Sequence, residues 1–117
     1  MLEAPPDTKK MYVLVNKSKL TLQQCAVQSC HAVSEYMGLY GHEYNTSDWC
    51  FSKEHRTMIL CDATEDQMVK MMKIYDILNK NYRTFREPDL NELLTAVAFE
   101  PVFASEGARL FKKFKLI

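Results

Sequence analysis

Two short apolar runs, each followed by a stretch with helical periodicity, constrain the fold of this chain more than any other feature. Met-Tyr-Val-Leu-Val-Asn at 11–16 is rich in β-branched residues and bounded by polar ones, which predicts a buried strand. Arg-Thr-Met-Ile-Leu-Cys-Asp at 56–62 predicts a second strand. Because a helix is expected after each strand, the two strands should pair in parallel through right-handed crossovers. The pattern predicts an α/β fold.

Each helical stretch has a threonine placed to cap its first turn. Thr21 is expected to begin a helix that runs to about Tyr40, and Thr64 to begin one within 63–81. The first helix is amphipathic, with His31 away from its most apolar face. We assign Leu22, Cys25, Ser29, Val33, Tyr36 and Tyr40 to its apolar side, Gln24, Gln28, His31 and Glu35 to a polar stripe opposite, and Met68, Met71, Met72, Tyr75 and Leu78 to the inward face of the second helix.

The remaining segments predict a mixed sheet in an α/β sandwich. Apolar and polar residues alternate well enough in 82–87 to predict a strand at the edge of the sheet. The apolar run 95–102 suits the middle of a sheet covered on both faces. Gly, Asn, Ser and Asp crowd into 41–49, which predicts a loop, and 88–94 should interrupt the strands. A short helix near the end of the chain is expected to carry Leu110, Phe111 and Phe114.

Size and charge limit the organisation of the chain and its partners. With 117 residues it holds one domain, taken as 11–117, after a flexible N-terminal arm at 1–10. The formal net charge is zero, so an anionic partner must be held by a local patch. No apolar run approaches the roughly 18 residues of a membrane span, and no membrane partner is expected.

The four cysteines, at 25, 30, 50 and 61, form no C-x-x-C pair. A zinc cage and a disulfide framework are therefore not expected, nor is a metal site at His42 or His55, which lack Asp or Cys partners at ligand spacing. Buried thiols in a reducing cytoplasm fit the cysteines best. The common nucleotide-cradle motifs and G-x-S-x-G are missing, which argues against those sites and against an acyl-enzyme.

Ligands of α/β sheets usually bind where loops converge at the carboxyl ends of strands, here 16–21, 62–64 and 87–95. In the first loop, Lys17 and Lys19 precede a helix N-terminus, where backbone N–H groups and the helix dipole favour an anion. A solvated turn would explain the same two lysines.

The third loop is the richest in titratable groups. Glu87, Asp89 and Glu92 bring three carboxylates just before the Thr95 hydroxyl. An aspartate beside a threonine and a lysine could position a water or stabilise a developing alkoxide. The alternative is that Asp89 caps a turn and Thr95 begins a strand. His31, at mid-helix between polar neighbours, is by its own chemistry a surface residue.

Two stretches resemble one enzyme family. Ala-Val-Gln-Ser-Cys-His-Ala-Val at 26–33, on the helix after the first strand, resembles the A-x-Q-x-x-H-A segment of class II peptidyl-tRNA hydrolases. Phe-Arg-Glu-Pro-Asp-Leu-Asn-Glu-Leu-Leu-Thr-Ala-Val-Ala at 85–98 resembles a compact subgroup, met in phage and bacterial genomes, whose loop has Glu-Pro-Asp-Leu. The spacing of the other segments extends the resemblance over 11–117.

The resemblance implies a fold and an activity. The fold is a three-layer sandwich, with a mixed four-stranded sheet and helices on both faces. Family members hydrolyse the ester bond of peptidyl-tRNA without metal or organic cofactor and release free tRNA; a related aminoacyl ester is a second expected substrate. Peptidyl-tRNA is thus the expected partner, in the cytoplasm, and the chain could form a homodimer, as family members often do.

All but one of the family's catalytic residues have a counterpart in this chain. Its hydroxyl matches Thr95 and its loop aspartate Asp89, so Asp89 is expected to orient water and Thr95 to bind the ester or that water. The family's lysine has no clean counterpart, because Leu22 or Gln24 stands in its place. Lys17 or Lys19 could reach the same space and hold phosphate. The expected substrate-binding residues are Lys17, Lys19, Gln24, Gln28, His31 and Glu87, with Gln28 and His31 shaping the pocket wall.

A second interpretation keeps the fold without the chemistry. In that case the chain is an inactive family member that binds RNA or a protein. The missing lysine favours this interpretation, and the presence of Asp89 and Thr95 counts against it.

Overall fold

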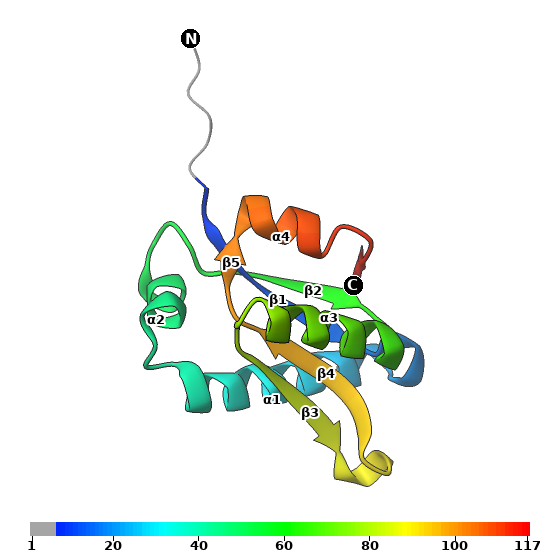
Figure 1. Cartoon of the computed structure of the whole chain (residues 1–117). Helices are drawn as coiled ribbons and strands as arrows, with labels where there is room; N and C mark the ends of the chain where they lie inside the picture. Colours follow the sequence, from blue (N-terminus) through cyan, green and yellow to red (C-terminus); the bar gives the residue numbers. More distant parts are fainter. Residues whose placement is uncertain (1–6) are drawn as a thin grey trace.

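The computed structural model describes residues 7–117. Of the predicted arm 1–10, residues 1–6 lie outside this part of the chain, and Lys9 and Lys10 already belong to the first strand. No helix of the described part combines the length and the hydropathy that crossing a membrane requires. In chain order (Figure 1) the elements are β1 (Lys9–Val15), η1 (Lys17–Lys19), α1 (Leu22–Tyr40), α2 (Tyr44–Phe51), β2 (Thr57–Asp62), α3 (Glu65–Ile77), β3 (Tyr82–Glu87), η2 (Pro88–Leu90), β4 (Leu93–Phe99), β5 (Val102–Phe103), α4 (Ala104–Leu110) and β6 (Lys115–Leu116).

A mixed sheet of strand order β3-β4-β1-β2-β6 forms the centre, and β5 also pairs with β1. The pairing of β1 with β2 is parallel, as predicted, whereas β4 is antiparallel to both β1 and β3. The predicted edge position of β3 is confirmed. The expected number of four strands is wrong, since the sheet of residues 7–117 has six. The two additional strands, β5 and β6, span two residues each and are defined by pairing with distant strands, so they leave no local pattern.

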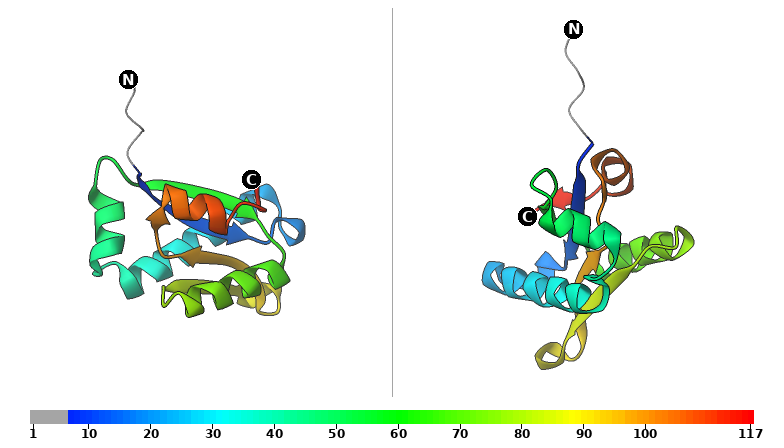
Figure 2. Two further views of the ribbon diagram at one scale, coloured as in Figure 1. Left: turned by 45° about the horizontal axis from the view of Figure 1, so that its top comes forward. Right: turned by 90° about the vertical axis from the view of Figure 1, so that its left-hand side faces the viewer.

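Helices pack against the sheet from opposite sides because successive residues of a strand point to opposite faces. Tyr12 and Leu14 of β1 belong to a buried cluster with residues of α3 and the segment after α4. Met11, Val13 and Val15 belong to a second cluster, with residues of α1 and α2. The right-hand view of Figure 2 places α1 and α3 on opposite sides of the sheet. The strand β4, which lies inside the sheet between β3 and β1, is therefore buried, as predicted.

Both predicted threonine caps are confirmed, and each forms a reciprocal capping box. The Thr21 hydroxyl accepts from the Gln24 backbone N–H at 3.1 Å, and the Gln24 side chain accepts from the Thr21 N–H at 2.8 Å. Thr64 and Gln67 repeat the arrangement at the start of α3, at 3.2 and 2.9 Å. These local bonds explain why the helix starts could be predicted from sequence.

The predicted loop at 41–49 is wrong, because α2 occupies most of it. Thr46 and Trp49, one helical turn apart, are buried. The Tyr36 hydroxyl hydrogen-bonds the Thr46 hydroxyl at 2.9 Å, and the Trp49 indole donates to the Thr57 carbonyl at 2.9 Å. Tertiary contacts to α1 and β2 thus hold a helix that the turn-forming composition does not favour.

Some predicted core positions also differ. Leu22 is 72% exposed, because the buried face of α1 begins only at Cys25, and Leu78 is 43% exposed, because α3 ends before it. The last helix ends at Leu110, but Phe111 and the later Phe114 are buried as expected.

Candidate functional site

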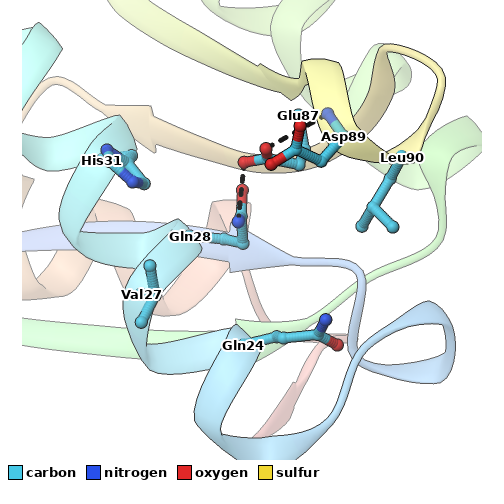
Figure 3. A pocket seen from close by; sticks show the side chains of 7 residues that line it. All are labelled: Gln24, Val27, Gln28, His31, Glu87, Asp89 and Leu90. Atoms are coloured by element: carbon cyan, nitrogen blue, oxygen red, sulfur yellow. Dashed lines mark hydrogen bonds between the residues drawn. The ribbon is translucent and has the colours of Figure 1, made fainter.

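A pocket of about 310 Å³ lies between the first half of α1 and the turn η2. Figure 3 shows its two walls, one from α1 and one from the end of β3 and the turn η2. The residues that line it are Gln24, Val27, Gln28, His31, Glu87, Asp89 and Leu90.

The α1 wall follows from helical spacing. Gln24, Val27, Gln28 and His31 are three or four positions apart and so share one face of the helix. The capping box fixes Gln24, whose Oε1 accepts from the Thr21 N–H. The amide group of Gln24 therefore has its Nε2 end available to a ligand in the pocket.

The opposite wall is shaped by a tight turn between β3 and β4. Pro88 begins η2 directly after Glu87, and the Asp89 backbone N–H donates to the Glu87 carboxylate at 3.3 Å. Asn91 and Glu92 both have left-handed backbone conformations, with φ of 56° and 59°, which turn the chain back into β4. The side chains of Glu87 and Asp89 are thereby held facing α1 (Figure 3).

A buried chain of hydrogen bonds joins the two walls. The Thr95 hydroxyl donates to Gln28 Oε1 at 2.7 Å and lies 3.2 Å from the Phe85 carbonyl oxygen. Gln28 Nε2 in turn donates to the Glu87 carboxylate at 3.0 Å. Thr95 is 0% exposed and Gln28 is 6% exposed. The sequence predicts Gln28 on a polar stripe away from the core, but the structure buries its amide, both ends of which have hydrogen-bond partners.

These contacts also set the charge of the pocket. The pKa of Glu87 is lowered from 4.5, first by the hydrogen bond from Gln28 and next by the backbone N–H of Asp89. Glu87 is therefore ionised at neutral pH. Both of its oxygens accept hydrogen bonds, whereas the exposed side chain of Asp89 lines the pocket beside it.

His31 stands at one end of the pocket against an aromatic ring. The imidazole stacks on Phe85, with ring centroids 4.6 Å apart and an interplanar angle of 9°. Phe85 also lines a separate hollow, together with Glu35 and Arg83. His31 is exposed and so presents its remaining surface to the pocket.

Five of the eight predicted site residues line the pocket: Gln24, Gln28, His31, Glu87 and Asp89. Thr95 does not line it, because its hydroxyl lies beneath Gln28. Lys17 and Lys19 also lie outside it, exposed on η1. Sequence reasoning missed Val27 and Leu90; the positions of Val27 on the Gln24–His31 face and of Leu90 next to Asp89 could have indicated them.

The turn η1 is nevertheless tied to the strand below the pocket. The Asn16 backbone N–H donates to the Thr95 carbonyl at 2.9 Å, and the Asn16 side chain donates to the Leu94 carbonyl at 3.4 Å. Lys17 follows Asn16 directly. The start of this basic turn is thus fixed against β4.

Residues 7–117 contain no group of three or more His, Cys, Asp or Glu side chains arranged to hold a metal ion.

Comparison with known proteins adds a family to this geometry. The family model described as peptidyl-tRNA hydrolase PTH2 matches residues 9–117, nearly the whole chain. No curated protein matches the sequence significantly.

Proposed function

This chain belongs to the peptidyl-tRNA hydrolase PTH2 family, and we propose that it hydrolyses the ester of peptidyl-tRNA, or a related aminoacyl ester, to release free tRNA. We further place it in the compact subgroup with a Glu-Pro-Asp-Leu loop and expect it to act in the cytoplasm on tRNA. A three-layer arrangement around the sheet and a homodimer belong to the same proposal.

The observation that carries the proposal is the pair of carboxylates on one wall of a small pocket whose other wall is fixed from below. Thr95 holds Gln28, Gln28 holds Glu87, and Glu87 accepts from the Asp89 backbone N–H. The network holds the Glu87 carboxylate directly and, through the Asp89 backbone N–H, the turn that carries the Asp89 carboxylate. A fixed position of this kind is what general-base catalysis requires, and both Glu87 oxygens are already occupied whereas the Asp89 carboxylate lines the pocket. This arrangement supports Asp89 as the group that acts on water.

In the proposed reaction, Asp89 accepts a proton from a water as the water oxygen attacks the ester carbonyl carbon. The bond between that carbon and the ribose oxygen then breaks, and the proton returns to the ribose oxygen. Gln24 Nε2, whose amide is fixed by the cap of α1, donates to the carbonyl oxygen as negative charge develops on it. Glu87 and Gln28 position Asp89 and shape the pocket for substrate. Because Thr95 is buried, it acts through Gln28 and is a positioning residue.

The phosphates of tRNA must lie outside the pocket, because Glu87 and Asp89 would repel them. Lys17 and Lys19 are exposed on η1, and Asn16 ties this turn to β4. We propose that these two lysines hold the tRNA backbone. With a formal net charge of zero for the whole chain, binding should depend on few phosphate contacts and so weaken only moderately with salt.

The test is release of tRNA from N-acetyl-aminoacyl-tRNA by the purified full chain and by Asp89→Asn. We expect release by the wild-type protein and a loss of about 100-fold or more in the variant, as is typical when a general base is removed. Asp66→Asn, an exposed carboxylate in the first turn of α3, is the matched control and should keep full activity. Binding of tRNA by the wild-type protein without release would favour the binding-module interpretation instead.

A further inference from the structure

Both acidic groups of the pocket lie on one wall. Val27 and the His31 ring lie one turn apart on the α1 wall, while Glu87 and Asp89 lie on the opposite wall. Val27 is 45% exposed, so its side chain is open to a ligand. A ligand that fills this pocket therefore meets Val27 and the His31 ring, beside two neutral amides, on one side and both negative charges on the other.

The size and charge of the pocket limit which part of a tRNA can enter. Its volume of about 310 Å³ is at the lower end of the roughly 300–1,000 Å³ of small-molecule sites, so only one end of the substrate fits. The two carboxylates exclude phosphate. The 3′-terminal nucleoside has no 3′-phosphate, because the tRNA chain ends there. Its one phosphate is the 5′ link to the rest of the tRNA, and its base is flat and apolar on both faces.

The packing of His31 suits it to receive such a base. Its ring is nearly parallel to that of Phe85, at 9° and 4.6 Å, so Phe85 supports one face of the imidazole. Phe85 is in turn packed against the buried cluster under α1. A ring supported in this way loses little conformational freedom when another flat group stacks on it. Any of the four bases can stack on an aromatic side chain, because every base has a flat π-face.

We propose that His31 is the stacking platform for the base of the 3′-terminal nucleoside, and that Val27 extends this surface. The proposal rests on the proposed function, since it takes an aminoacylated or peptidylated nucleoside as the ligand. The base lies on the α1 wall, and the ribose with its ester points to Asp89 on the other wall. His31 is then a substrate-binding residue that acts through its flat ring rather than through proton transfer.

The test measures binding rather than turnover. The probe is a 3′-amino-3′-deoxyadenosine that carries an N-acetyl-aminoacyl group through an amide, which replaces the ester bond. Calorimetric titration compares the wild-type protein with His31→Ala and His31→Phe; His42→Ala, which removes an exposed histidine outside the pocket, is the control. We expect His31→Ala to weaken binding on the order of tenfold, His31→Phe to bind nearly as tightly as the wild-type protein, and His42→Ala to bind normally.

A second probe, the same amide on a ribose without a base, separates stacking from other roles of His31. Its affinity should be equal for the wild-type protein and His31→Ala. The proposal is overturned if the wild-type protein does not bind the nucleoside probe, if His31→Ala binds it normally, or if His31→Phe is as defective as His31→Ala. If the protein binds the probe through His31 but cleaves no ester, only the hydrolase function is contradicted. If the protein releases tRNA but His31→Ala binds the probe as tightly as the wild-type protein, only the stacking is contradicted.

Discussion

The Thr95 hydroxyl donates a 2.7 Å hydrogen bond to the side-chain oxygen of Gln28, which joins the interior strand β4 to α1 beneath the pocket. Both residues are buried, and Gln28 passes the connection on to Glu87 through its Nε2. A hydroxyl in this position supports the pocket from below. The Gln28 amide therefore couples the acidic wall of the pocket to the buried strand β4.

Replacing Thr95 should weaken both the fold and the site. Thr95→Val keeps the shape of the side chain but leaves Gln28 Oε1 buried without its donor, which should lower the free energy of unfolding by about 1–3 kcal/mol. Release of tRNA should also slow, because Gln28 no longer holds Glu87 in one orientation. Urea unfolding and a release assay measure the two effects. Thr95→Ser retains the hydroxyl and should restore most of both; equal defects in the two variants would argue against the hydrogen bond as the cause.

The two capping boxes allow the role of Gln24 to be isolated. Glutamate in place of glutamine still accepts from the capping threonine's N–H but has no amide to donate. Gln24→Glu should therefore fold normally and lose about 100-fold in the rate of tRNA release, in line with removal of one donor to a developing oxyanion. Gln67→Glu makes the same change in the capping box of α3, away from the pocket, and should leave release unchanged. Single-turnover release and thermal unfolding check both variants, and full activity in Gln24→Glu would exclude the proposed donor.

Acid should destabilise the protein in part through Asp48. The pKa of Asp48 is lowered from 3.8, first by the hydrogen bond from the Lys9 ammonium group, at 2.7 Å. A carboxyl whose pKa is lower in the folded state stabilises the protein above its unfolded pKa, and this contribution is lost as pH falls through the folded value. Asp48→Asn should thus be less stable than the wild-type protein at neutral pH, with the difference shrinking below about pH 4. Urea unfolding between about pH 2.5 and 7 measures this difference, with Glu54→Gln as an exposed loop control. A difference independent of pH would contradict the prediction.

Two glycines should respond to alanine in opposite directions. A Cβ atom at Gly107 would lie 2.5 Å from the ring of Tyr12, and that ring is itself stacked on Phe111 at 4.1 Å. Gly107→Ala should therefore lower the free energy of unfolding by about 1–3 kcal/mol. Gly38, inside α1, has nothing within 4 Å of the added atom, so Gly38→Ala should raise stability by about 0.5–1 kcal/mol. Chemical denaturation of the two variants tests both, and a stable Gly107→Ala would mean that Tyr12 can move aside.

The sequence by itself determined the features that depend on neighbouring residues. Thr21 and Thr64 bond partners three positions away, so the starts of α1 and α3 are encoded locally. The apolar runs of β1 and β2, each followed by a helix, were enough to predict parallel pairing. Helical spacing likewise placed Gln24 and His31 on one face, and both line the pocket.

Only the tertiary structure decided the features that depend on distant contacts. The helix at 44–51 is held by α1 and β2, and the two-residue strands β5 and β6 exist only through pairing with β1 and β2. Thr95 and Gln28 are 67 positions apart, so no local pattern could indicate that one is buried beneath the other. Hydrophobic periodicity shows which side of an element faces the core, but the partner met there depends on how the whole chain packs. For that reason the sequence could predict Thr95 as a site residue, whereas only the fold decided that its hydroxyl lies beneath Gln28 rather than in the pocket.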